Sequence, residues 1–218
     1  MKPFIKLLLI IATFFATTFL VIKSTGLLTV EHIEAWLTQA KSLSPLYVGT
    51  IIALLLLADL FIAIPTLTVT ILAGYFLGYP YGALAALTGL MSAGICGYAL
   101  SRYYGQSILG FLLKDDMQRN EAIVTFRRHG FIMILLSRAM PILPEATACL
   151  AGMSRMPFVK FLVAWSISTV PYVLIASYAG SISSIDAPKP ALIAAIGITG
   201  FFWVSWYLYR RMSNNTAM

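Results

Sequence analysis

Charged residues and cysteines are scarce in this chain. Only 11% of its 218 residues are Asp, Glu, Lys or Arg, whereas 60% are hydrophobic, and the mean hydropathy is +0.87. Ordinary soluble domains carry about 25% charged residues. The composition therefore excludes a typical soluble enzyme or binding module, and it indicates an all-α membrane protein with several membrane-embedded segments.

The two cysteines, Cys96 and Cys149, both lie in apolar runs, without CxxC spacing and without a histidine nearby. This arrangement indicates neither a disulfide framework nor a zinc site, and we interpret both residues as small packing groups. A nucleotide-binding glycine loop is also missing, because the glycines of residues 89–97 come with no lysine and no preceding strand. The sequence thus predicts no metal and no cofactor.

Acidic residues are fewer than basic ones, eight against 15, which gives a formal net charge of +7. The basic residues cluster beside apolar segments, so we interpret them as topology signals and contacts with anionic lipids rather than as a nucleic-acid surface. By the positive-inside rule, the clustered side and both chain termini face the cytoplasm. The cluster comprises Arg102, Lys114, Arg119, Arg127, Arg128, Arg155, Lys160, Arg210 and Arg211.

The apolar pattern divides the chain into three parts. Residues 1–45 contain an apolar run at 7–22, interpreted as an uncleaved transmembrane helix, and an amphipathic stretch at 30–41 that would lie along the membrane surface. Residues 46–180 form the core, which holds two broken apolar segments. Residues 181–218 provide a last transmembrane helix and a cytoplasmic tail.

The first broken segment covers residues 47–78, where Asp59 and Pro65 interrupt an otherwise apolar sequence. As helices, its arms at 47–64 and 66–78 would measure about 27 and about 20 Å. The second arm is too short for a hydrocarbon core of about 30 Å. A re-entrant hairpin, which enters the membrane and returns to the same face, fits better than two full crossings.

The second broken segment, residues 135–158, carries Arg138, Pro141, Pro144 and Glu145. A charged side chain at the bilayer centre costs about 2.5 to 3.5 kcal/mol on insertion scales, and a proline removes a backbone donor that lipid cannot replace. Such a segment is tolerated where the broken backbone faces protein or a water-filled cavity. It predicts a second re-entrant hairpin and marks the candidate functional site.

The two broken segments are related by a weak internal repeat with an offset of 78 residues, which aligns Leu72-Ala73-Gly74 with Leu150-Ala151-Gly152. Each copy would be a re-entrant hairpin followed by a spanning helix, and the two copies would enter from opposite faces of the membrane. This is the inverted repeat of secondary transporters, which bind substrate near the midplane. Asp59, Arg138 and Glu145 would then converge on one cavity.

The ionisable side chains of these segments have complementary chemistry. A guanidinium is a permanent cation suited to a phosphate or a carboxylate. A buried carboxyl group can carry protons between the two faces or act as a gate, unless the guanidinium holds it as the anion. We therefore expect substrate binding by Arg138, Pro141, Pro144 and Thr68, and proton coupling or gating by Glu145 and Asp59.

The residues alone also allow other interpretations. An Arg to acid pair could simply lock the two hairpins together, and Thr66, Thr68 and Thr70 could satisfy backbone groups freed by the proline rather than contact substrate. An enzyme acting inside the membrane, such as a phosphatase or hydrolase that uses His129, is a further alternative. His129 is otherwise interpreted as a helix-end residue.

Between the two segments, a helix is predicted at residues 81–104, and small residues at every fourth position predict a ridge where another helix can approach closely. Tyr98, Tyr103 and Tyr104 are interpreted as interfacial anchors. The connection up to a helix at 131–140 is expected to form helices along the membrane surface. The small residues are Gly89, Ala93, Gly97, Ser101 and Gly105.

Short motifs recur over residues 59–180. They are Asp59 before Pro65, Ala73-Gly74 with Gly78 and Gly82, Gly94 with Tyr98, Arg102-x-x-Gly105, Phe126-x-x-x-Gly130, Arg138-x-x-Pro141, Ala151-Gly152-Met153, Met156, Phe161 and Tyr178-x-Gly180. Together they resemble the DedA family, within the wider superfamily that shares the VTT domain (SNARE-associated Golgi protein homologues). The resemblance implies two facing re-entrant hairpins. It also implies lipid movement: proton-linked recycling of undecaprenyl phosphate in bacterial members, and phospholipid scrambling in eukaryotic relatives.

Two positions depart from the DedA pattern. DedA proteins carry a second arginine six residues after the first, where this chain has Pro144 followed by Glu145. The acidic residue that they place shortly after the proline of the first hairpin is also missing, with Thr66 and Leu67 near that place. These departures look more like the VTT branch outside DedA proper, and they bear on the substrate and on the number of coupled protons.

The sequence therefore predicts a protein of the bacterial inner (plasma) membrane that moves a lipid, as a flippase or scramblase. The expected partners are undecaprenyl phosphate or an anionic phospholipid, together with protons; neither an enzyme activity nor nucleic-acid binding is expected. The alternatives are a proton-coupled transporter of a small solute and a membrane-organising protein that transports nothing.

Overall fold

The computed structural model describes residues 9, 10, 13, 17, 44–62, 64–112, 116–139, 143–183 and 189–215. Within these ranges the chain is helical, with seven α-helices and one short 3₁₀ helix, η1, and the predicted all-α class is confirmed. The predicted helices at 7–22 and 30–41 lie largely outside the described residues, as does Pro141. The elements are α3 (Pro45–Ala58), α4 (Thr66–Leu77), α5 (Tyr81–Leu112), α6 (Asp116–Leu136), η1 (Ser137–Ala139), α7 (Leu143–Met153), α8 (Phe158–Ser181) and α9 (Lys189–Asn215).

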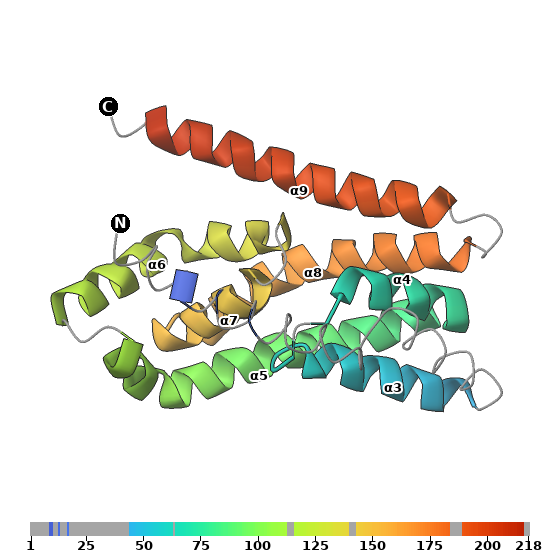
Figure 1. Ribbon diagram of the computed structural model, residues 1–218, viewed down its shortest axis with the longest axis horizontal. Coiled ribbons are helices and arrows are strands. Elements are labelled where there is room, and N and C mark those ends of the chain that lie inside the picture. Colours follow the sequence, from blue (N-terminus) through green and yellow to red (C-terminus); the bar gives the residue numbers. More distant parts are fainter. Residues whose placement is uncertain are drawn as a thin grey trace.

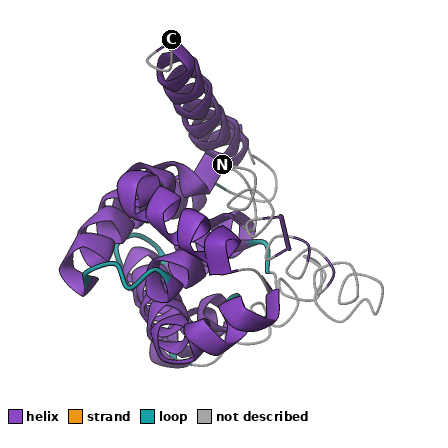
Figure 2. Ribbon diagram, turned by 90° about the vertical axis from the view of Figure 1, so that its left-hand side faces the viewer, coloured by secondary structure: helices purple, strands orange, loops and turns teal. Residues whose placement is uncertain are grey.

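The six helices α3 to α8 form two units of three, arranged in opposite directions (Figure 1). The hairpin of α3 and α4 opens at the right-hand end of the view, whereas the hairpin of α6 and α7 opens at the left-hand end. The long helices α5 and α8 run along the molecule, and the closed ends of both hairpins lie near its middle. α9 packs on α8 and η1 and lies outside the other helices on one side (Figures 1 and 2).

Two stretches of the described chain are long and apolar enough to cross a membrane, Tyr81–Gly105 within α5 and the whole of α8, with 25 and 24 residues. At about 1.5 Å per residue they measure about 37 and about 36 Å, which exceeds a hydrocarbon core of about 30 Å. The apolar helices α3 and α4 have 14 and 12 residues, and α7 has 11. These three measure about 21, 18 and 17 Å and cannot cross on their own.

The first hairpin turns earlier than the sequence predicted. α3 ends at Ala58 rather than at Ile64. The reason is that the Asp59 carboxylate, rather than a helix carbonyl, accepts a hydrogen bond from a backbone N–H that follows the helix. Its Oδ1 accepts the Ile64 N–H at 2.7 Å. An aspartate that bonds to a nearby backbone N–H offers the chain an alternative to continued helix. The carboxylate therefore closes the loop between α3 and α4.

The described part of the connection between residues 104 and 131 is helical, as predicted, and whether its helices lie along the membrane surface stays a prediction. α5 continues to Leu112, and α6 begins at Asp116 and runs without a break to Leu136. Phe126 and Ile134, eight residues apart on one helical face, are both buried. Burial of this face against α8 and α7 holds α6 as one continuous helix.

Glycines allow each hairpin to cross the long helix of the other unit at backbone distance. A Cβ on Gly74 of α4 would overlap the carbonyl of Ser177 on α8, and a Cβ on Gly152 of α7 would overlap the carbonyl of Tyr98 on α5. Gly74 and Gly152 are 78 residues apart in the chain, the offset found in the sequence. The two hairpins thus use corresponding glycines for corresponding contacts.

The ridge of small residues predicted on α5 is confirmed as a packing surface. A Cβ on Gly89 would come within 2.7 Å of the Ala53 carbonyl oxygen of α3, and a Cβ on Gly105 would meet Met153 of α7. Close approach of this kind is what small residues at every fourth position provide. α5 therefore contacts both hairpins along its length.

Candidate functional site

Arg138 lies in η1, at the closed end of the second hairpin, and its guanidinium contacts three side chains of α8. Its Cζ is 5.3 Å from the ring centroid of Trp165 and 4.9 Å from that of Tyr172, and Nη2 donates a hydrogen bond to Thr169 Oγ1 at 3.1 Å. Positions 165, 169 and 172 follow the helical spacing that places side chains on one face. One face of α8 thus holds the cation by two aromatic rings and one hydroxyl.

The Arg138 Nε is buried and has no hydrogen-bond partner among the described residues. Buried polar groups are nearly always paired, and a charged donor without a partner costs more than a neutral one. The surrounding side chains cannot rotate freely to meet it, because Trp165 donates its Nε1–H to the Leu90 carbonyl at 3.2 Å and Thr169 is fully buried. Arg138 is therefore held in place with one donor left for another acceptor.

The two predicted acidic residues lie next to each other at the closed ends of the hairpins. Asp59 follows α3, and Glu145 lies in the first turn of α7. Glu145 and Arg138 are both near enough to interact electrostatically with Asp59. The structure thus brings Asp59, Arg138 and Glu145 together, as the internal repeat predicted.

Tyr172 links this cluster to the first hairpin. Its hydroxyl lies 3.5 Å from Thr66 Oγ1 at the start of α4, and its ring faces Arg138 of the second hairpin. The same hydroxyl is within electrostatic range of Asp59 and Glu145. A single buried side chain of α8 therefore touches the closed ends of both hairpins.

The other predicted substrate-binding residues in the described chain, Pro144 and Thr68, differ in burial and in hydrogen bonding. Pro144 is buried in the first turn of α7, and its carbonyl accepts the Thr147 hydroxyl at 2.9 Å. Thr68 is half-buried in the first turn of α4, and within the described chain no hydrogen bond involves its hydroxyl. Thr70 donates its hydroxyl to the Thr66 carbonyl of its own helix at 2.7 Å, so it is used for a local backbone bond.

Sequence reasoning missed the three residues that hold Arg138 on α8. α8 is apolar over most of its surface, and the prediction treated it as a simple crossing. The available signal was the Trp-x-x-x-Thr-x-x-Tyr spacing at 165–172, which places one polar hydroxyl between two aromatic rings on a single helical face.

Tyr98 was wrongly interpreted as an interfacial anchor. It is buried, stacks on Phe161 with ring centroids 4.7 Å apart, and donates its hydroxyl to the Met156 carbonyl. Tyr103 and Tyr104, interpreted in the same way, are exposed, at 80% and 56%. Tyr98 joins α5 to the turn before α8, a role that depends on helix rotation and that its sequence position did not show.

Comparison of the sequence with known proteins identifies the family. The sequence profile of the VTT domain matches residues 64–182, more than half of the chain. Similar proteins include an uncharacterized membrane protein of Synechocystis sp., 28% identical over 171 residues, which cover 69% of this chain and 78% of that protein. Undecaprenyl phosphate transporter A of Bacillus subtilis is 27% identical over 164 residues, covering 69% of this chain and 76% of that protein.

A third relative, the uncharacterized protein YqeD of Bacillus subtilis, is 27% identical over 154 residues, covering 68% of this chain and 72% of that protein. No solved structure matches the chain significantly. One of these relatives is named as a membrane protein, and this chain has two helices that are long and apolar enough to cross a membrane. The chain is therefore an integral membrane protein. It belongs to the VTT domain (DedA) family.

Proposed function

We propose that this protein moves a phosphate-bearing lipid, undecaprenyl phosphate or an anionic phospholipid, across the membrane, and that Arg138 binds the head group. The observation that carries the proposal is the buried Arg138 Nε without a partner among the described residues. A guanidinium matches phosphate oxygens in geometry and charge. The relative named undecaprenyl phosphate transporter A supports this class of substrate.

The two helical units would form an inverted repeat with re-entrant hairpins. The short helices α3, α4 and α7 support this, since none is long enough to cross. The hairpins open at opposite ends of the molecule, and their closed ends meet near its middle (Figure 1). The cluster of Arg138, Asp59 and Glu145 would then lie near the midplane, where secondary transporters bind substrate.

The orientation follows from charge. The exposed basic residues of α5, α6 and the turn before α8 lie at the end where the second hairpin opens. By the positive-inside rule this end faces the cytoplasm, in a bacterial inner membrane with both termini on the cytoplasmic side. The first hairpin would then enter from the outer face.

Proton coupling follows from the charges of the cluster. With both carboxyl groups ionised, Asp59, Glu145 and Arg138 sum to one negative charge, which repels a phosphate. One bound proton makes the cluster neutral, and a second makes it positive. Two carboxyl groups that lie close together share a proton readily. Proton binding would therefore favour head-group binding, and by linkage head-group binding would favour proton uptake.

Transbilayer movement in proteoliposomes tests the proposal. A labelled polyprenyl phosphate and a labelled phospholipid would be followed with and without a pH gradient, in the native protein, Arg138→Ala and the control Arg128→Ala. Arg128 is exposed on α6, so its loss should leave transport unchanged. Movement that disappears only in Arg138→Ala supports the proposal. Equal movement in all three proteins, or none in folded native protein, contradicts it.

A structural lock is the competing function, and the contact between Asp59 and Glu145 favours it because it joins the two hairpins. In that case the protein organises the membrane and transports nothing. Glu145→Gln separates the two functions. A proton-coupled transporter should lose the effect of a pH gradient on transport and keep its thermal stability, whereas a lock should lose stability.

A further inference from the structure

The turn between α7 and α8 has an unusual backbone. Arg155 has a φ of 54° and is the one non-glycine residue with positive φ in the described chain. The turn closes α7 by hydrogen bonds from Met156 N to the Ala151 carbonyl and from Arg155 N to the Gly152 carbonyl, each 3.0 Å. Glycine is the usual residue at this left-handed position after a helix, because a Cβ there is strained.

The corresponding turn of the first unit has the glycine. Gly78, between α4 and α5, has a φ of 70° and precedes Pro80 by two residues, as Arg155 precedes Pro157. Both turns thus have a backbone that favours glycine. The turn at the basic end of the molecule has an arginine there, whereas the other turn has the glycine. Strained non-glycine residues of this kind are often found at ligand sites.

Two further cations support this turn from neighbouring helices. Arg102 of α5 donates from Nη1 to the Met156 carbonyl at 3.3 Å, and Arg127 of α6 donates from Nε to the Ser154 carbonyl at 3.0 Å. These bonds satisfy the carbonyl oxygens of the turn from the protein side. The turn is thus braced by α5 and α6 together.

The remaining cations of the turn point outward. Arg155 and Lys160 are exposed, and neither forms an ion pair with a residue that the structure describes. Next to Lys160, Val159 is 70% exposed and Phe158 is 43% exposed. Exposed basic side chains beside exposed apolar ones are typical of a surface at the lipid head-group level. Figure 2 is viewed from this end of the molecule.

We propose that the α7–α8 turn is a docking site for the phosphate head group of an anionic membrane lipid. Arg155 and Lys160 contact the phosphate, and Phe158 and Val159 lie against the upper acyl chains. Charge complementarity selects the ligand, since the exposed cations of the turn match an anionic head group and the apolar neighbours exclude a fully hydrated ion. The site is separate from Arg138 and does not depend on lipid movement.

Arg155→Gly gives a sharp test, because it removes the cation and relaxes the backbone in one substitution. The full-length protein in zwitterionic detergent would be titrated with dioleoylphosphatidylglycerol and, separately, with dioleoylphosphatidylcholine and inorganic phosphate, with binding followed by native mass spectrometry. One basic residue at a membrane surface contributes about fivefold in affinity for an anionic lipid. We expect about fivefold weaker phosphatidylglycerol binding in Arg155→Gly and in Lys160→Gln.

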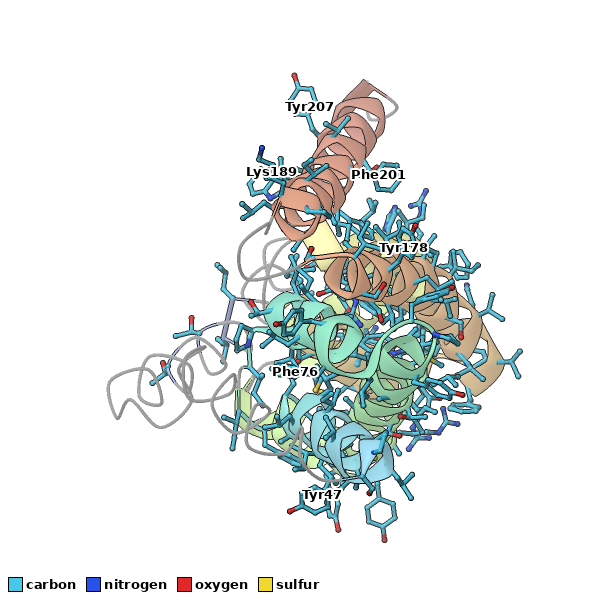
Figure 3. The ribbon with its side chains drawn as sticks, turned by 90° about the vertical axis from the view of Figure 1, so that its right-hand side faces the viewer. Tyr47, Phe76, Tyr178, Lys189, Phe201 and Tyr207 are labelled. Carbon is cyan, nitrogen blue, oxygen red and sulfur yellow. The ribbon has the colours of Figure 1, made fainter. Side chains whose placement is uncertain are left out.

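The matched control is Lys189→Gln at the opposite end of the molecule, where Lys189 points outward (Figure 3). It should bind phosphatidylglycerol as the native protein does. The double variant of Arg155 and Lys160 should lose about 25-fold. Unchanged binding in the double variant, an equal loss in Lys189→Gln, or equal binding of inorganic phosphate would overturn the proposal. So would a lower melting temperature of lipid-free Arg155→Gly, because the strained arginine would then be structural.

Discussion

The contact between Thr169 and Arg138 makes a quantitative prediction. Thr169→Val keeps the shape of the side chain and removes the acceptor of Arg138 Nη2, which lies 3.1 Å away at a fully buried position. Nε of the same guanidinium already lacks a partner in the described chain, so the variant leaves a second donor unpaired. A hydrogen bond to a charged group contributes about 1.5 to 3 kcal/mol.

We therefore expect the free energy of unfolding to fall by about 2 kcal/mol. For a chain of this length that corresponds to a decrease in melting temperature of about 4 to 8 °C, measured by tryptophan fluorescence in detergent. Because the valine cannot orient the guanidinium, transport of a labelled polyprenyl phosphate in proteoliposomes should fall as well. Loss of stability alone would show that Thr169 does not serve the head-group site.

Ser168→Ala is the matched control. Ser168 is also buried on α8, but its hydroxyl donates to the Trp165 carbonyl of its own helix at 3.1 Å. Removing such a bond changes stability little, because alanine is the better helix former. If both variants melt and transport alike, Thr169 does not support Arg138 and the reasoning is refuted. In an Arg138→Met background, Thr169→Val should cost much less, since the charged donor is gone.

Three further predictions concern packing and proton coupling. Gly74→Ala and Gly152→Ala place a Cβ into the backbone of the facing helix, and each should destabilise the protein by about 1 to 3 kcal/mol in thermal melts. Gly200→Ala on α9 is the control and should leave stability unchanged, because no described atom lies within 4 Å of its added Cβ. Glu145→Gln should abolish the effect of a pH gradient on transport and shift the melting temperature by less than Gly152→Ala; an unaltered gradient effect would remove Glu145 from proton coupling. Tyr98→Phe should lower stability by about 0.5 to 1.5 kcal/mol, measured in the same melts, because it removes the donor to the Met156 carbonyl; no change would mean that Arg102 alone suffices.

The convergence of Asp59, Arg138 and Glu145 was predictable because it depends on large-scale features of the sequence. Apolar arms too short to cross must turn back, and a repeat offset by 78 residues brings the two turns together. The lengths of these segments do not depend on how each helix is rotated.

The α8 contacts to Arg138 were not predictable for the opposite reason. α8 is apolar over most of its surface, and the spacing of Trp165, Thr169 and Tyr172 marks one face without showing that this face meets Arg138. Rotation of this helix is set by Gly180 and Ser177, which meet the backbone of α4. The early end of α3 was missed because a single side chain, Asp59, replaces helix by a local hydrogen bond.

Each unit packs a glycine of its hairpin on the long helix of the other unit, and this affects how the protein folds while it is being synthesised. Gly74 of α4 packs on Ser177 of α8, and Gly152 of α7 packs on Tyr98 of α5. The first hairpin therefore has no partner for its glycine face until the ribosome has made α8, and it must wait in the membrane in an incomplete form. Each half lacks the helix on which its own glycine packs, so the two halves are expected to regain the native structure only when both are inserted together.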